Sequence, residues 1–420
     1  MNYLKVFEEC KKLTDMATFA TFDSFKVLHE EMRKTGGTIF NIFNPVGVSG
    51  DNLQEFDKIV DNIWLNKDKS TYYLSRDTIK NYCLDVIQEI HANGEDSTKN
   101  NTELRTRWEE LLKREMKNYT VVFPIHGVTI DKVTPISLFT AYNFADFKTF
   151  IENLNPNEKL LYDELLKNET SYLVFQTEAK DSSRAIEIAR PYFELFEYIS
   201  KFWVDDSLNL SVGIFKYKKW EIKAGLAITP SSVSASFDEK GAYKDIDISA
   251  LTKSLTMSRI WEIMTKYIQE RTTEIETRLI NAIRWVGMAN SDDSNVTKHV
   301  QYVFAIEALL SHKPADEIIT PSISYQLAEY AAFIIGEIAD IKTTSKKDFR
   351  AKIFHEVKHV YSTRSKVAHG NDKNVNVHEI TRAHKLINTL ICAILQNDTI
   401  LKFNSMKELD TWIENLKFSS

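Results

Sequence analysis

The chain of 420 residues contains little cysteine, glycine or proline: 3 Cys, 12 Gly and 8 Pro. The three cysteines, Cys10, Cys83 and Cys392, are odd in number and lie far apart in the sequence. This spacing excludes a disulfide framework or a cysteine metal knuckle, and it favours a reducing, cytoplasmic environment. The scarcity of glycine and proline predicts long helices joined by few elaborate loops.

Long apolar runs and phosphate-binding loops are also missing. No apolar run approaches the length of a membrane span, and residues 1–6 do not follow the charged-then-apolar plan of a signal peptide. We therefore expect no membrane partner. No glycine-rich loop ends in Gly-Lys-Ser or Gly-Lys-Thr, so nothing in the sequence predicts ATP hydrolysis, and we expect no cofactor.

The residues that are present describe an ordinary soluble globular protein, with 43% hydrophobic and 27% charged residues. A chain of this length is expected to form two or three domains. The hydrophobic pattern predicts an α+β fold that is predominantly α. We expect a mixed α/β region over residues 1–250, with a helical part over 1–118 and a strand-containing part over 119–250. A helical bundle with a tail helix is expected over 251–420.

Hydrophobic periodicity predicts helices over residues 4–15, 23–35, 53–66, 75–93, 101–117, 182–202, 296–310, 322–341, 347–368, 377–395 and 406–416. Strands are predicted over 119–124, 171–176, 208–217 and 220–228. The last two strands flank a Lys-Lys turn, which predicts a hairpin between them. Pro191 falls inside the helix predicted over 182–202 and is expected to kink or split it.

Basic residues gather near the C-terminus although the net charge of the chain is −6. From Lys346 to Lys385, ten Lys or Arg residues oppose four acidic residues, so this segment carries +6 and the remainder −12. A basic segment within an acidic protein is what recruitment of phosphate requires. Lys358, Lys366 and Lys373 are therefore candidate RNA-binding residues, although solvated helix faces explain such a segment as well.

The sequence with the most specific chemistry is residues 364–370, Arg-Ser-Lys-Val-Ala-His-Gly. An arginine can hold phosphate, and a histidine titrates near neutrality, so the two can cleave RNA without a metal. Helical spacing places Arg364 on an otherwise apolar stripe, where a guanidinium needs an anionic partner. If the helix ends at Ala368 and Gly370 releases His369 from the helical path, Arg364 and His369 can converge on one phosphate.

Glu307 is the candidate partner of Arg364. It is the one charged residue within the apolar run over 300–310, where an isolated carboxylate is costly. A Glu307–Arg364 pair would orient the arginine. Arg284 is an alternative partner for Glu307, and a purely structural carboxylate at the rim of the bundle also fits the pattern.

Three stretches in this order resemble the HEPN superfamily, in its ApeA-like type: residues 279–285 (LINAIRW), 302–310 (YVFAIEALL) and 361–370 (YSTRSKVAHG). The resemblance covers roughly residues 270–396. The superfamily hallmark is an arginine, a polar residue, a few spacers and a histidine, matched here by Arg364, Ser365 and His369. Glu307 and Ser365 would support this pair.

The resemblance implies a metal-independent endoribonuclease that acts as a homodimer on RNA, with tRNA as one candidate substrate, often as an anti-phage or toxin component. It further implies that the N-terminal region senses a phage-derived trigger or restrains the nuclease, or that an inhibitory partner does so. The chemistry also favours a dimer, because cleavage by the ribose 2′-OH uses a base and an acid, and the motif supplies one histidine per chain.

Two alternatives remain open at this point. A HEPN-like dimer can grip RNA or a partner protein without cutting it. Alternatively, His355-Glu356-Val357-Lys358-His359 spells the H-E-x-x-H pattern of zinc hydrolases. No third ligand follows at an expected interval and lysines flank the run, so we expect no metal site.

Overall fold

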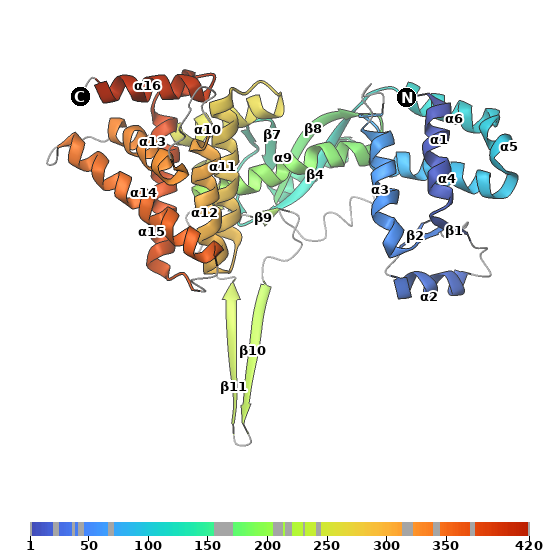
Figure 1. The fold of residues 1–420 in the computed structure, drawn as a ribbon, viewed down its shortest axis with the longest axis horizontal. Helices are drawn as coiled ribbons and strands as arrows, with labels where there is room; N and C mark the ends of the chain where they lie inside the picture. Colours follow the sequence, from blue (N-terminus) through green and yellow to red (C-terminus); the bar gives the residue numbers. More distant parts are fainter. Residues whose placement is uncertain are drawn as a thin grey trace. The chain divides into compact units, whose positions relative to one another are not determined.

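The computed structural model describes residues 2–19, 25–35, 38–40, 46–65, 71–154, 171–204, 213–214, 221–229, 232–240, 245–312, 322–338, 345–369 and 374–418. This part of the chain is α+β and predominantly helical, with a helical C-terminal region, which confirms the predicted fold class. Figure 1 shows the helices and strands in chain order.

The chain divides into two compact units, one formed by residues 1–121 and 176–191 and the other by residues 122–175 and 192–420. The division falls inside three elements, namely β4 (Lys117–His126), β8 (Ser171–Ala179) and α9 (Ser182–Trp203). It does not coincide with the expected boundary at residue 250, and that domain organisation stays a prediction.

The first unit is a helical group with one small sheet. Its helices are α1 (Tyr3–Thr14), α2 (Phe25–Thr35), α3 (Gly50–Trp64), α4 (Arg76–Asn93), α5 (Glu95–Lys99) and α6 (Thr102–Lys113). Its antiparallel sheet has the order β1 (Ala17–Phe19), β3 (Val46–Val48), β2 (Thr38–Phe40). Apolar side chains at helical spacing on α1, α3 and α4 build a shared core around Trp108 of α6, as amphipathic helices do.

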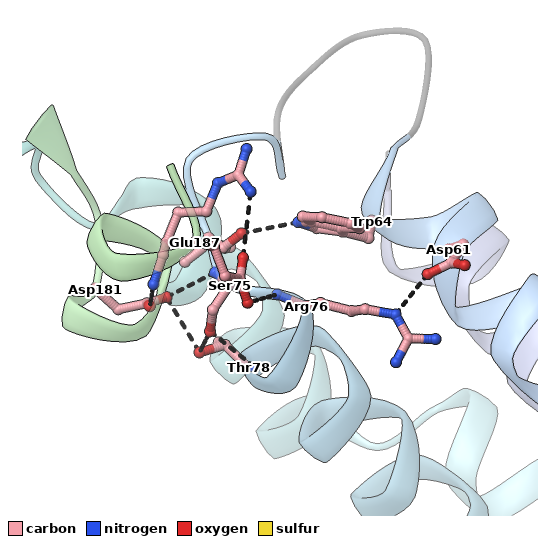
Figure 2. Close-up of polar contacts among 9 residues, drawn as sticks. Asp61, Trp64, Ser75, Arg76, Thr78, Asp181 and Glu187 are labelled. Atoms are coloured by element: carbon pink, nitrogen blue, oxygen red, sulfur yellow. Dashed lines mark hydrogen bonds and ion pairs between the residues drawn. The ribbon is translucent and has the colours of Figure 1, made fainter. Parts of the chain in front are cut away.

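A polar network closes the N-terminal ends of α4 and α9 in the first unit. The carboxylate of Asp181 accepts hydrogen bonds from Ser75 N (2.9 Å), Thr78 Oγ1 (3.1 Å) and Arg184 N (2.8 Å), as Figure 2 shows. It therefore satisfies backbone donors that the first turn of a helix leaves free. Glu187 does the same for the backbone of Arg76.

Arg184 is nearly buried in this network, with 8% of its side chain exposed. Its guanidinium lies 5.0 Å from the ring centre of Trp64 and 4.8 Å from that of Tyr72, and it pairs with Glu187 at 3.2 Å. Aromatic faces and a carboxylate together stabilise a cation that water no longer reaches. The arginine therefore fixes α9 to its neighbours within the unit.

The second unit contains a sheet of five strands in the order β6 (Thr134–Ile136), β7 (Phe139–Tyr142), β8, β4, β9 (Gly213–Ile214). Helix α7 (Phe144–Leu154) packs beside β7, and β12 (Ile246–Asp247) pairs in parallel with β5 (Val128–Thr129). Phe139 of β7 packs edge to face against Phe193 and Phe196 of α9. These aromatic side chains build a core, as alternating apolar residues on a half-buried sheet require.

The predicted hairpin between residues 208–217 and 220–228 is wrong. Strand β10 (Glu221–Thr229) pairs instead with β11 (Ser232–Lys240) in antiparallel register, from Glu221 opposite Lys240 to Thr229 opposite Ser232. Two residues separate these strands in the sequence, a spacing typical of a hairpin, but the Lys-Lys dipeptide upstream has the same spacing, so loop length alone does not decide the pairing. Of the upstream strand, residues 213–214 pair with β4, and its remaining residues, 208–212 and 215–217, lie outside the described ones.

Helix α9 is a single helix of 22 residues that contains Pro191. The proline was expected to kink or split the helix, and it does not split it. Proline removes one backbone hydrogen bond, but Phe193 and Phe196 directly beyond it are fully buried, and this packing holds the next turns in place.

The rest of the second unit is a helical group: α10 (Leu255–Ile268), α11 (Glu274–Ser291), α12 (Asn295–Leu310), α13 (Ile323–Ile338), α14 (Lys346–Ala368), α15 (Val377–Gln396) and α16 (Met406–Phe418), with short 3-10 turns η3 (Ile248–Leu251) and η4 (Ile400–Lys402). Helix α11 approaches α9 closely at Gly287, where an added Cβ would lie 2.4 Å from the carbonyl oxygen of Tyr198. Only glycine fits at such a backbone crossing.

Candidate functional site

Helix α14 carries the Arg364–His369 motif and lies at the edge of the helical group. It begins after Ser345, whose hydroxyl accepts the N–H of Asp348 at 3.1 Å, and it ends at Ala368. It packs on α13 and α12 along a narrow side where Val357 and Val360 are its fully buried residues. A wide face of the helix is therefore left open to solvent.

Arg364 lies on the packed side of α14, as the apolar stripe predicts. Its guanidinium lies 5.5 Å from the ring centre of Phe304 on α12 and 5.9 Å from that of Tyr361. Its Nη2 is 3.9 Å from Oε1 of Glu307, so the predicted Glu307–Arg364 pair forms, but loosely. The side chain is 27% exposed, and its buried Nε has no hydrogen-bond partner among the described residues.

Glu307 therefore sets the electrostatics on the inner side of Arg364. Burial, followed by the negative charge of Glu307, raises the pKa of the Tyr361 hydroxyl above its usual value. The phenol consequently stays protonated and can donate a hydrogen bond to this carboxylate. The guanidinium keeps unused donors in a planar fork that matches a phosphate group.

His369 occupies the C-cap position of α14, and its side chain is exposed. Its backbone does not leave the helical path at Ala368, because its N–H still donates to the carbonyl of Ser365 at 3.1 Å. The expected release of His369 toward Arg364 is therefore wrong, and Gly370, which was expected to cause it, lies outside the described residues. Five helical positions separate the two side chains by roughly 140°.

The remaining predicted residues of the site are distributed along the outer face of α14. Lys358 and Lys366 are exposed, and Ser365 is half-buried beside the motif. Lys373 lies outside the described residues. His355, Lys358, Ser362, Lys366 and His369 follow one another at intervals of three or four residues, so they form one exposed stripe that we call the outer stripe of α14.

A chain of ion pairs joins α14 to the start of α15. Glu356 pairs with Arg382 at 3.1 Å, Arg382 pairs with Glu379 at 3.2 Å, and Glu379 lies 2.9 Å from Nε2 of His359. Because the pairs are partly exposed, each contributes little stability alone, about 0–1 kcal/mol. Together they hold the motif-bearing half of α14 in register with α15.

The same contacts bear on the H-E-x-x-H alternative. His355 is exposed, while His359 and Glu356 each contact α15. In the part of the chain that the structure describes, no three His, Cys, Asp or Glu side chains gather closely enough to hold a metal ion. A catalytic zinc ion takes three protein ligands, and the described surroundings of this pair offer no such set.

His299 on α12 is a functional group that the sequence analysis did not single out. It is fully buried, and within the described residues neither ring nitrogen has a hydrogen-bond partner. Burial lowers its pKa, and the nearby charge of Glu379 acts in the opposite direction. Its spacing of three, four and seven residues from the buried side chains of Tyr302, Val303 and Ile306 is the signal that predicts its burial.

Within the described residues, no helix combines the length and the apolar character needed to cross a membrane. Comparison of the chain with protein-family models, curated proteins and solved structures finds no match in any of the three.

Proposed function

We propose that the chain is a metal-independent endoribonuclease of HEPN type that works as a homodimer, with Arg364 and His369 as its catalytic residues. The observation that carries this proposal is the state of Arg364, whose guanidinium is fixed between two rings but paired only at 3.9 Å and still partly exposed. A held cation with unused donors is suited to stabilising the added charge of a phosphorane. The family resemblance supports the same roles.

In the proposed reaction His369 removes the proton from a ribose 2′-OH. The 2′-oxygen then attacks the adjacent phosphorus, and the bond to the 5′-oxygen breaks. His369 of a second copy of the chain protonates the departing 5′-oxygen, so the products are a 2′,3′-cyclic phosphate and a 5′-hydroxyl. Arg364 holds the phosphate throughout.

The direction of the two side chains supports the need for a second copy. Arg364 faces α12, whereas His369 is exposed at the end of the helix and makes no side-chain hydrogen bond within the described residues. A twofold axis near the C-terminal end of α14 would bring two histidines and two arginines around one phosphate. One His369 would then serve as the base and the His369 of the second copy as the acid.

The biological setting is proposed from the resemblance alone. An anti-phage or toxin-like role in the cytoplasm would suit an RNA-cleaving chain, with residues 1–250 sensing a phage-derived trigger or holding the nuclease inactive. Arg364 and His369 would then be silent until the trigger arrives.

The test is cleavage of tRNA and of total RNA by the full chain, in the presence of EDTA, with product ends identified by mass spectrometry. We expect 2′,3′-cyclic phosphate ends, and His369→Ala should lower the rate by about 10²–10⁴-fold, the usual contribution of acid–base catalysis. His378→Ala is the matched control, because His378 is exposed on the neighbouring helix α15 and lies outside the motif.

Undiminished cleavage by His369→Ala, or complete loss of wild-type cleavage in EDTA, would overturn the proposed mechanism. RNA binding without any cleavage would instead favour a non-catalytic RNA-binding dimer. In that case Arg364→Ala should weaken binding while no product ends appear.

A further inference from the structure

An aromatic pair, one ring exposed and the other half-buried, lies between the start of α13 and the middle of α14. Tyr325, 45% exposed, meets Phe354 edge to face at a ring-centre distance of 5.2 Å. Phe354 in turn contacts His355 at 5.8 Å, and Nζ of Lys358 lies 5.7 Å from its ring centre. The phenol of Tyr325 makes no hydrogen bond within the described residues. We call these four side chains the aromatic–cationic platform.

The platform lies on the same side of α14 as His369. His355 and Lys358 belong to the outer stripe, which ends at His369. His369 follows His355 by 14 positions, so the two residues lie about 21 Å apart along the helix axis at 1.5 Å per residue. That length corresponds to about six nucleotides of a stacked strand at 3.4 Å per step, and to fewer nucleotides of an extended one.

The charge around the platform suits a polyanion. The acidic residues nearest in the sequence are already engaged, because Glu356 pairs with Arg382 and Glu329 pairs with Lys417. The carboxylate of Asp348 accepts a hydrogen bond from the hydroxyl of Ser345 at 2.6 Å. The lysines of the outer stripe, Lys358 and Lys366, have no carboxylate within ion-pair distance in the described chain. The stripe therefore attracts phosphates along its length.

We propose that this platform is a base-stacking subsite for single-stranded RNA, with Tyr325 stacking on a base while Lys358 and Lys366 follow the backbone toward His369. An exposed ring beside lysines is how proteins bind single strands, because every base offers a π-face and the cations track the phosphates. The inference rests on the proposed function and deepens it, since it names the unpaired strand as substrate.

Single-stranded RNA fits this surface better than a duplex or a protein partner. In a duplex the faces of the bases are covered by their neighbours, so a flat exposed ring has nothing to stack on. A protein partner would bury apolar area generally, and Ile323, 50% exposed two residues before Tyr325, would then matter as much as the tyrosine. Stacking instead requires the aromatic ring alone.

The test measures binding of a fluorescein-labelled single strand of about 12 nucleotides to the full chain. All variants carry His369→Ala, so that no cleavage occurs. Tyr325→Leu keeps an apolar side chain but removes the ring, and it should weaken binding about tenfold, since stacking of one base contributes that much. Tyr325→Phe and the neighbouring control Ile323→Ala should each bind within about twofold of the parent.

A second measurement places the base. A 2-aminopurine moved along the strand should be quenched at one position, a few nucleotides from the scissile phosphate, and Tyr325→Leu should abolish that quenching. Unchanged affinity of Tyr325→Leu, equal loss in Ile323→Ala, or equal affinity for a duplex would overturn the subsite. If the wild type cleaves RNA despite such a result, the proposed function stands and the subsite alone falls. If it neither binds nor cleaves RNA, both fall.

Discussion

Arg184 in the first unit and Arg364 in the second have nearly the same neighbours but different freedom. Each guanidinium lies over two aromatic rings beside one carboxylate, and each has a buried Nε without a hydrogen-bond partner among the described residues. Arg184 is 8% exposed with its carboxylate at 3.2 Å, whereas Arg364 is 27% exposed with its carboxylate at 3.9 Å.

This difference separates a structural arginine from one that can bind a ligand. The tight pair of Arg184 uses its charge internally, so that its removal should disturb folding. The longer pair of Arg364, on a partly exposed side chain, leaves its guanidinium less engaged by the described residues. Under the proposed function the two arginines would therefore have different roles although their neighbours are alike, because Arg364 is more exposed and less tightly paired than Arg184.

The largest expected effect comes from Arg364→Ala. We expect RNA cleavage to fall by about 10²–10³-fold, as when one transition-state donor is removed. The free energy of unfolding should change by less than about 1 kcal/mol, because the ion pair is long and partly exposed. Single-turnover rates and urea unfolding measure the two quantities. A large loss of stability with activity retained would mean that Arg364 is structural like Arg184.

Arg184→Ala should show the reverse pattern. Loss of a cation held between two rings and a carboxylate should lower the free energy of unfolding by about 2–3 kcal/mol, because burial strengthens cation–π contacts and leaves Glu187 without its partner. Urea unfolding measures this value. Arg190→Ala is a control from the exposed side of the same helix. RNA cleavage below the unfolding temperature should stay within about twofold of the wild type.

The smallest expected effect concerns His299. This histidine is buried, and within the described residues neither of its ring nitrogens has a hydrogen-bond partner. Because burial lowers its pKa, the unfolded chain binds a proton at this site more readily than the folded chain does. Stability is therefore lost as pH falls below about 6.5, by at most about 1.4 kcal/mol per pH unit, until the folded-state pKa is reached.

His299→Leu should flatten this pH dependence. The comparison is the free energy of unfolding of both proteins between pH 7.5 and pH 5, because other histidines contribute equally to each. Glu379 and His359 face this site from α15 and α14, so both must be unchanged in the two proteins. Parallel pH profiles for wild type and variant would show that His299 is not held neutral by burial.

Local rules in the sequence predicted much of the fold. Residues 347–368 were predicted as a helix, and α14 spans Lys346–Ala368, because apolar spacing is a local signal. The inward direction of Arg364 followed from the same spacing. Its contact with Glu307 was one of two alternatives, proposed because Glu307 is the one charged residue in the apolar run over 300–310. The pairing of β10 with β11 was missed, because the prediction placed the turn at the Lys-Lys dipeptide, and the sequence alone does not show with which neighbour a strand pairs.

Contacts between segments that lie far apart in the sequence could not be predicted from it. Asp181 meets Ser75 across 106 positions, and Tyr325 on α13 meets Phe354 on α14. No local pattern specifies which exposed rings come together, so the aromatic–cationic platform emerged only in three dimensions. Similarly, the helical hydrogen bond from His369 to Ser365 competes with release by the following glycine, and spacing alone does not decide between them.

The close crossing of α9 and α11 at Gly287 has a practical consequence for protein engineering. Asn290 on α11 also donates to the carbonyl of Lys201 on α9 at 2.8 Å, and Trp261 stacks on Phe196 at 5.0 Å. A fragment that starts near residue 251 lacks α9. It would therefore expose to water the surface around Gly287, the face of the Trp261 ring and the side-chain N–H of Asn290 that α9 otherwise covers. We therefore expect that the helices carrying the motif do not form a stable fragment by themselves, and that a transferred fragment has to include α9.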